Sequence, residues 1–121
     1  MTDAAESDDG VDVMATVYRV TAVPAEAREH RDANMWALWV EHRGNGRWLV
    51  TNGTQVLSRG GWRAESEIAA EDWAQWIADS RLSLGQALRV AKDIAPRIVI
   101  GDRDAAGFAE WVKQQDETQQ P

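Results

Sequence analysis

Two arginines beside a predicted turn are the residues best placed for chemistry, because together they could hold an anion. Arg43 and Arg47 flank Gly44-Asn45-Gly46, and a three-residue loop places their side chains opposite one another. Like charges opposed on neighbouring strands are unfavourable unless an anion or a carboxylate joins them. An anionic partner would satisfy both arginines, and so would solvent or pairing with Glu41 and the acidic helices. The sequence leaves both explanations open.

An apolar cluster lies on the same predicted face as these arginines. Trp39, Leu49 and Val56 occupy the middle of that face, and its ends are polar. Tryptophan and arginine are enriched at the centres of protein interfaces. We therefore expect Trp39, Leu49 and Val56 to bind a partner, with Arg43 and Arg47 at the rim. The alternative is that the first strand, the loop after it or a helix of the same chain covers the cluster.

Patterns typical of catalysis, metal binding or cofactor binding are missing from the sequence. His30 and His42 stand in no metal-ligand spacing, and no glycine-rich nucleotide-binding pattern occurs. The chain has no cysteine, which excludes thiol catalysis, zinc-thiolate sites and disulfides. Asp102 and Asp104 could form a carboxylate pair, but they precede a predicted helix, and capping explains them. We expect no enzymatic activity, catalytic residue, metal site or cofactor.

Short antiparallel strands are needed to position the arginines and the Trp39 cluster. They are expected at residues 16–23, 35–43, 47–51 and 54–58, separated by turn signals. With Asn52-Gly53 as a two-residue loop, the side chains of both hairpins alternate consistently between two faces. The face opposite the Trp39 cluster then carries Trp36, Leu38, Val40, Trp48, Val50 and Leu57.

Helices dominate the last part of the chain. They are expected at residues 68–80, at 84–95 and after Asp102 or Asp104, with a short strand at 97–100. Ser83 and Gln86 have the spacing of a capping box. The predicted fold is α+β: an antiparallel β-meander of three to four strands with two to three helices packed on one face, in the order β-β-β-β-α-α-β-α.

The apolar pattern predicts one core shared by the sheet and the helices. The strand residues expected in it are Trp36, Leu38, Val40 and Trp48. The helix residues expected to pack against them are Leu84, Leu88, Trp73 and Trp76.

Length and charge indicate one small domain with acidic ends. The 121 residues suffice for one core, and the net charge is −7. Residues 1–12 hold five acidic residues and no basic residue, which is typical of a disordered tail. We expect a single domain over residues 13–115 and a frayed tail over 116–121. The charge disfavours direct binding of nucleic acid, and no run approaches the length of a membrane span.

Three motifs resemble those of small uncharacterised proteins of actinobacteria and their phages. A tryptophan-rich meander ends in a G-x-W-x-x-E-like stretch at residues 60–65. An L-x-x-A-L-x-x-A helix follows at 84–91, and an A-P-x-V-x-x-G-like stretch lies at 95–101. The resemblance covers residues 16–113 and implies a phage or actinobacterial origin. It implies no activity and no site residue.

These observations together predict a small non-enzymatic interaction protein of the cytoplasm, or of the host cytoplasm if a phage encodes it. Its expected partner is another protein or a second copy of the chain, bound through the face of Trp39 and the arginines. An acidic inhibitor that mimics DNA is the alternative. It draws on the net charge of −7, although the interleaved arginines interrupt any continuous negative stripe.

Overall fold

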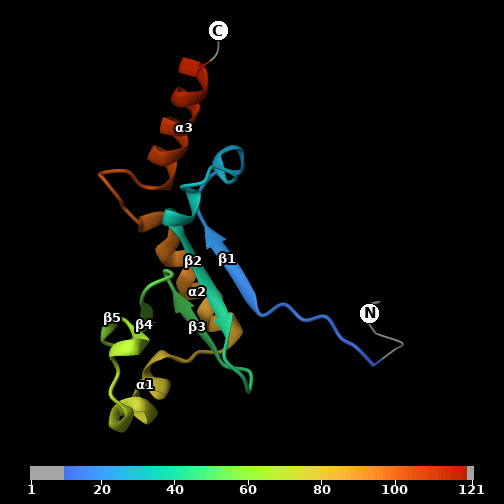
Figure 1. Ribbon diagram of the computed structural model, residues 1–121, viewed down its shortest axis with the longest axis vertical. Helices are drawn as coiled ribbons and strands as arrows, with labels where there is room; N and C mark the ends of the chain where they lie inside the picture. The colour runs from blue at the N-terminus through green and yellow to red at the C-terminus, as the bar shows by residue number, and fades with distance from the viewer. Residues whose placement is uncertain (1–9, 120–121) are drawn as a thin grey trace.

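The computed structural model describes residues 10–119 as one antiparallel sheet and three helices (Figure 1). The five strands lie in chain order, so the sheet is a simple meander. They are β1 (Val17–Thr21), β2 (Ala37–His42), β3 (Trp48–Thr51), β4 (Val56–Ser58) and β5 (Gly61–Arg63). The helices are α1 (Trp73–Ser80), α2 (Leu84–Ile94) and α3 (Ala105–Gln119). The predicted α+β class is confirmed, with five strands instead of three to four.

The β2–β3 hairpin has the predicted register. Val40 lies opposite Val50, and His42 lies opposite Trp48. The loop Gly44-Asn45-Gly46 has φ angles of 91°, 55° and 69°, a left-handed backbone that glycine and asparagine adopt at little cost. The turn chemistry therefore fixes the pairing of the two strands.

The next hairpin turns one residue later than predicted. Thr51 pairs with Val56, which makes Gly53-Thr54 the central pair of the turn in place of Asn52-Gly53. The side chain of Asn52 stabilises this turn by accepting hydrogen bonds from the N–H groups of Thr54 at 3.0 Å and Gln55 at 2.8 Å. The pairing shifts by two residues in total, so every side chain keeps its predicted face.

One predicted strand is wrong, and one observed strand was not predicted. Residues 61–63 form β5, which pairs with β4 and was not among the expected strands. Residues 97–100 form no strand; Ile98 and Ile100 are half-buried while Val99 is exposed. The alternating exposure therefore reflects the packing of Ile98 and Ile100 onto the core, not the pairing of residues 97–100 with a neighbouring strand. The element order is therefore five strands followed by three helices.

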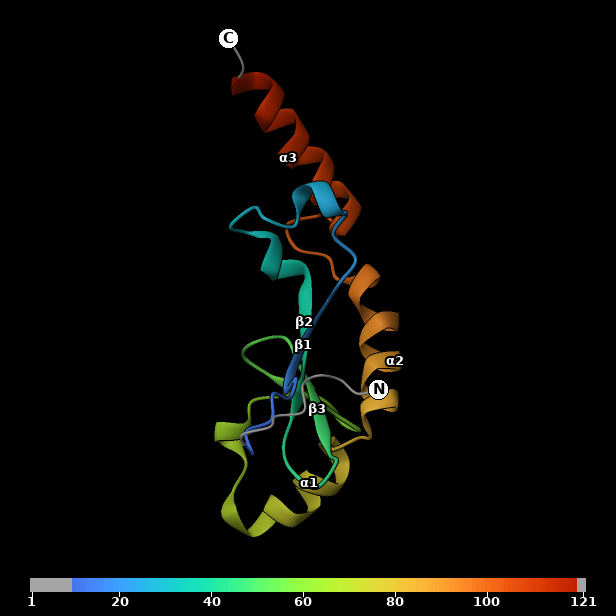
Figure 2. The ribbon, with the colours of Figure 1, turned by 90° about the vertical axis from the view of Figure 1, so that its right-hand side faces the viewer.

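Helix α2 covers one face of the sheet, as Figure 2 shows in side view. Leu38, Val40, Trp48 and Val50 of the sheet pack there against Ala87 and Ala91, with Leu84 and Leu88 beside them. The small alanines let the helix approach the strands closely. The helix begins at the predicted capping box, in which Ser83 accepts from the Gln86 N–H at 3.2 Å and the Gln86 side chain accepts from the Ser83 N–H at 3.1 Å.

The expectation that all helices share one face of the sheet is wrong. Trp76 of α1 packs with Leu49 and Val56 on the face opposite α2. Trp73, one turn earlier, is exposed and joins no core. Helix α1 follows β5 at the far edge of the meander, so the chain can pass beneath the sheet before α2 returns above it.

Helix α3 docks on the segment between β1 and β2 and extends past the end of the sheet (Figure 1). Trp36 was expected in the sheet core, but its ring stacks on Phe108 of α3 at 4.3 Å between centroids. Asp104 is a cap, since its Oδ1 accepts from the Gly107 N–H at 2.9 Å. The helix continues to Gln119, into the segment expected to fray. The predicted acidic tail at 1–12 lies mostly outside the described residues.

Candidate functional site

The predicted partner-binding cluster is largely covered by the chain itself. Leu49 is 1% exposed and Val56 is 6% exposed, because Trp76 and Ile68 lie against them. Trp39 is half-buried and stands opposite Thr51. The covering helix was the alternative that the sequence left open, and it occupies the middle of this face.

A polar network holds the covering tryptophan in place. The Trp76 Nε1–H donates to Oε2 of Glu65 at 2.7 Å. The same oxygen lies 3.0 Å from the Arg81 guanidinium, whose side chain is 8% exposed. Arg81 also donates to the Ser80 hydroxyl, and that hydroxyl donates to the Trp76 carbonyl oxygen at 2.7 Å. The Trp76 indole N–H, the Ser80 hydroxyl and both terminal amino groups of Arg81 therefore each have a partner in this network.

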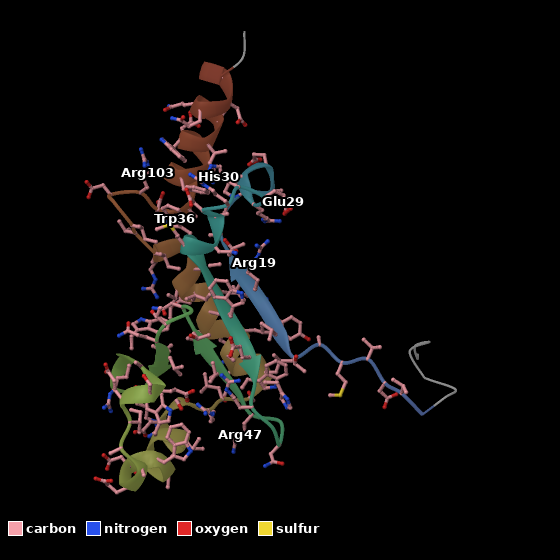
Figure 3. The ribbon with its side chains drawn as sticks, in the orientation of Figure 1. Arg19, Glu29, His30, Trp36, Arg47 and Arg103 are labelled. Carbon is pink, nitrogen blue, oxygen red and sulfur yellow. The ribbon has the colours of Figure 1, made fainter. Side chains whose placement is uncertain are left out.

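The two predicted rim arginines differ in environment. Arg43, just after β2, donates to Glu41 of β2 at 2.9 Å, whereas Arg47 projects from the exposed turn at the lower end of Figure 3. The backbone N–H of Arg43 donates to the Arg47 carbonyl oxygen at 2.8 Å, so both belong to the same hairpin end. Glu41 supplies the negative charge that an anionic partner would otherwise provide.

A polar hollow of about 260 Å³ remains on this face. Its lining includes Glu41, Thr51, Gly53, Glu65 and Ser66. Glu41 is paired with Arg43, and Glu65 is shared between Trp76 and Arg81. Both carboxylates that line the hollow are therefore already paired within the chain.

Neither histidine lies in a cluster of possible metal ligands. The His30 ring lies in T-shaped arrangements with the rings of Phe108 and Trp111, and its Nδ1 accepts from the Asp32 N–H at 3.1 Å. His42 packs on Trp48 at 5.0 Å between ring centroids. Within residues 10–119, no group of three or more His, Asp or Glu side chains could hold a metal ion.

The base of α3 gathers aromatic and basic side chains, as Figure 3 shows for His30, Trp36 and Arg103. The Trp36 Nε1–H donates to the Arg103 carbonyl oxygen at 2.9 Å, and the Arg103 guanidinium lies 5.3 Å from the Trp111 ring. These contacts join α3 to the segment that precedes β2. Packing between α3 and this segment therefore accounts for the cluster of aromatic and basic side chains.

An apolar groove lies on the α2 side of the sheet, near the ends of β2 and β5. It has a volume of about 560 Å³, within the range of typical ligand pockets. Its apolar lining includes Met35, Leu38, Trp62, Ile94, Ile98 and Val99, and its polar lining consists of Asn52, Thr54 and Arg97. We call this surface the Trp62 groove.

Exposed apolar side chains flank the Trp62 groove. Val99 is 63% exposed and Met35 is 53% exposed. Trp62 lies opposite Leu57 across the β4–β5 turn, where Gly61 has a φ of +110°. This site was not among the predicted binding residues, although the glycine pair Gly60-Gly61 is typical of a turn. A turn of that kind signals a second strand beyond it, and that strand carries Trp62.

None of the helices that the structure describes is long and apolar enough to cross a bilayer. No known family model, curated protein or solved structure matches the chain.

Proposed function

We propose that this chain is a non-enzymatic interaction protein that binds an apolar segment of a partner protein in the Trp62 groove. The observation that carries the proposal is the groove of about 560 Å³ flanked by the exposed side chains of Met35 and Val99. Apolar surface with a polar rim is typical of protein interaction sites. Asn52, Thr54 and Arg97 supply that rim.

The lining of the groove indicates the chemistry of the partner. Trp62 and the isoleucines at 94, 98 and 100 would receive two or three large apolar side chains. Arg97 already pairs with Asp93, one helical turn before it, and the Arg97 side chain stays mostly exposed. A polar or acidic residue beside the apolar segment of the partner would therefore meet Arg97 at the edge of the groove. This surface keeps the predicted combination of tryptophan and arginine, on the opposite face of the sheet.

The DNA-mimic alternative has less support. Glu41, Glu65 and Asp93 each form an ion pair with an arginine, which lowers the net negative charge of the surfaces around them. The phage or actinobacterial origin stays a prediction from the resemblance.

Peptide selection tests the proposed groove directly. A random peptide display library would be selected on the full chain, and the enriched peptides would be titrated against variants. Val99→Glu places a charge at the mouth of the groove, and Trp73→Glu makes a matched change at an exposed site on α1. We expect Val99→Glu to weaken binding about tenfold or more and Trp73→Glu to leave it unchanged. Enriched peptides that bind Val99→Glu and Met35→Glu as tightly as the parent chain would contradict the proposal.

A further inference from the structure

Exposed apolar side chains concentrate at the start of the sheet, away from the Trp62 groove. Val11, Val13, Met14, Val17 and Tyr18 all belong to β1 or to the seven residues before it. Val13 is 85% exposed and Met14 is 70% exposed. In Figure 1 this segment leaves the lower end of β1 and runs away from the rest of the fold. An apolar stretch this exposed is typical of an interaction surface.

Strand β1 also has an open edge. Of the strands that the structure describes, β1 pairs with β2 alone. The His42 N–H donates to the Thr16 carbonyl oxygen at 2.8 Å. Because antiparallel ladders alternate, every second residue from Thr16 turns its N–H and C=O toward β2. The residues between these turn their backbone N–H and C=O groups toward the open edge. They are Val17, Arg19 and Thr21.

The open edge lacks the features that protect other sheet edges. β5, at the opposite edge, has only three residues, whereas β1 has five and follows an extended segment. Residues 11–21 contain no proline and no lysine, and their only charged side chains are Asp12 and Arg19. Unprotected edges of this kind pair readily with another strand.

We propose that two copies of this chain join edge to edge through antiparallel pairing of residues 11–21, with the two-fold axis at Thr16. The five strands of each copy would then form one continuous sheet of ten. This axis lies at the middle of the segment, with five residues before Thr16 and the five residues of β1 after it. Residues 11–15 of one copy therefore lie along residues 17–21 of the other.

The symmetry agrees with the backbone geometry. A two-fold axis perpendicular to a sheet keeps each side chain on its own face, so paired residues must be both odd or both even in number. Odd-numbered residues, which turn their backbone groups outward at β1, then meet odd-numbered residues of the other copy. The four such pairs between residues 13 and 19 would form about eight hydrogen bonds, comparable with a typical protein interface.

The register also covers the exposed side chains. Met14 of one copy comes opposite Tyr18 of the other, whose ring lies 5.7 Å from the Trp48 ring within its own chain. A thioether beside an aromatic ring is a favourable contact. On the other face, Val17 meets Ala15 and Val13 meets the aliphatic part of Arg19.

Charge favours a second copy in the antiparallel direction. Residues 1–12 carry five acidic side chains and no basic one. Parallel pairing would place the two acidic segments side by side, where they repel. Antiparallel pairing of eleven residues separates the points where they leave the sheet by ten residue intervals, about 33 Å, well beyond the screening length at physiological salt.

The test measures association of the full chain and locates the axis. Sedimentation over a concentration series reaching the high micromolar range gives the dimer dissociation constant. Val17→Pro removes an N–H that faces the open edge and leaves the β1–β2 ladder intact, while Val17→Thr keeps that N–H as the matched control. Met14→Asp adds a charge outside the β1–β2 ladder, so it does not depend on how well the proline variant folds. We expect Val17→Pro and Met14→Asp to raise the dissociation constant about tenfold or more, with Val17→Thr unchanged.

Cysteine scanning gives the register, because the chain has no cysteine of its own. At the axis, the two Thr16 Cα atoms would lie about 4.5 Å apart, within the range that a disulfide spans. We expect Thr16→Cys to crosslink under mild oxidation far faster than Arg47→Cys at the exposed β2–β3 turn. A chain that stays monomeric throughout the series would overturn the proposal. A dimer that both disruptive variants leave intact, or equal crosslinking at the two cysteines, would overturn it as well.

Discussion

Strands β3 and β1 are both rich in β-forming residues, yet one is enclosed and the other is open. All four residues of β3 are buried, because α2 lies on one face and Trp76 lies on the other. The first three residues of β1 are exposed, and its outer edge faces no other strand among residues 10–119. Local sequence makes both segments strands, while their position in the meander decides what covers them.

The two covers of β3 are also built differently. On the α2 side, Ala87 and Ala91 allow close apolar packing. On the α1 side, Trp76 is held by a hydrogen bond to Glu65, which also pairs with Arg81. Substitutions on the first side should therefore act through lost packing, and those on the second side through lost polar contacts as well.

The largest expected effect is the loss of the Trp48 side chain. Trp48→Ala removes a buried indole from the α2 side of β3 and should lower the free energy of unfolding by about 3–5 kcal/mol. Chemical denaturation monitored by circular dichroism measures the change. Trp73→Ala, at an exposed indole, is the control and should change the free energy by about 1 kcal/mol or less. A loss below about 1 kcal/mol for Trp48→Ala would contradict the enclosure of β3.

Leu49→Ala tests the other cover of the same strand. The side chain is fully buried beneath Trp76, so the free energy of unfolding should fall by about 2–5 kcal/mol. The same denaturation experiment measures it. Unchanged stability combined with weaker partner binding would instead favour the role in partner binding that the sequence suggested for Leu49.

Two substitutions of Glu65 distinguish the contribution of its hydrogen bond with Trp76 from that of its ion pair with Arg81. Glu65→Ala leaves the buried Arg81 guanidinium without its carboxylate and should cost about 1–3 kcal/mol. Glu65→Gln keeps an acceptor for the Trp76 indole N–H and should cost less. Equal stabilities of the two variants would show that the hydrogen bond accepted from the Trp76 indole N–H contributes nothing.

Removing the acidic segment should have the smallest effect. Residues 1–10 are mostly small or acidic, so their deletion removes little apolar surface. We expect the melting temperature to change by less than about 5 °C. Thermal melts of the two chains at equal concentration measure the change. A larger drop would show that this segment contributes to the stability of the fold.

The sequence predicted the parts of the fold that local chemistry determines. The positive φ angles required at Gly44-Asn45-Gly46 fixed the first hairpin, and the spacing of Ser83 and Gln86 fixed the start of α2. Alternation sorted the strand side chains correctly onto two faces. It could not tell which helix covers which face, so Trp76 was expected on the wrong side.

The Trp62 groove lay beyond sequence reasoning for a similar reason. Its lining comes from the β1–β2 connection, β2, the β3–β4 turn, β5, and the end of α2 with the segment after it. No spacing within the chain links these segments. By contrast, the open edge of β1 can be inferred from two features. The strand order places β1 at the edge of the sheet, and exposed apolar residues precede it in the chain.

Hydrogen exchange at single amides tests the contrast between the enclosed and the open strand most directly. At low protein concentration, the β3 amides should exchange slowly, and those of Val17 and Arg19 should exchange much faster than that of Tyr18, which faces β2. Raising the concentration should slow exchange at Val17 and Arg19 as the edges pair, with little change in β3. Amides of Val17 and Arg19 that are already protected at low concentration, or that stay fast at high concentration, would contradict the account.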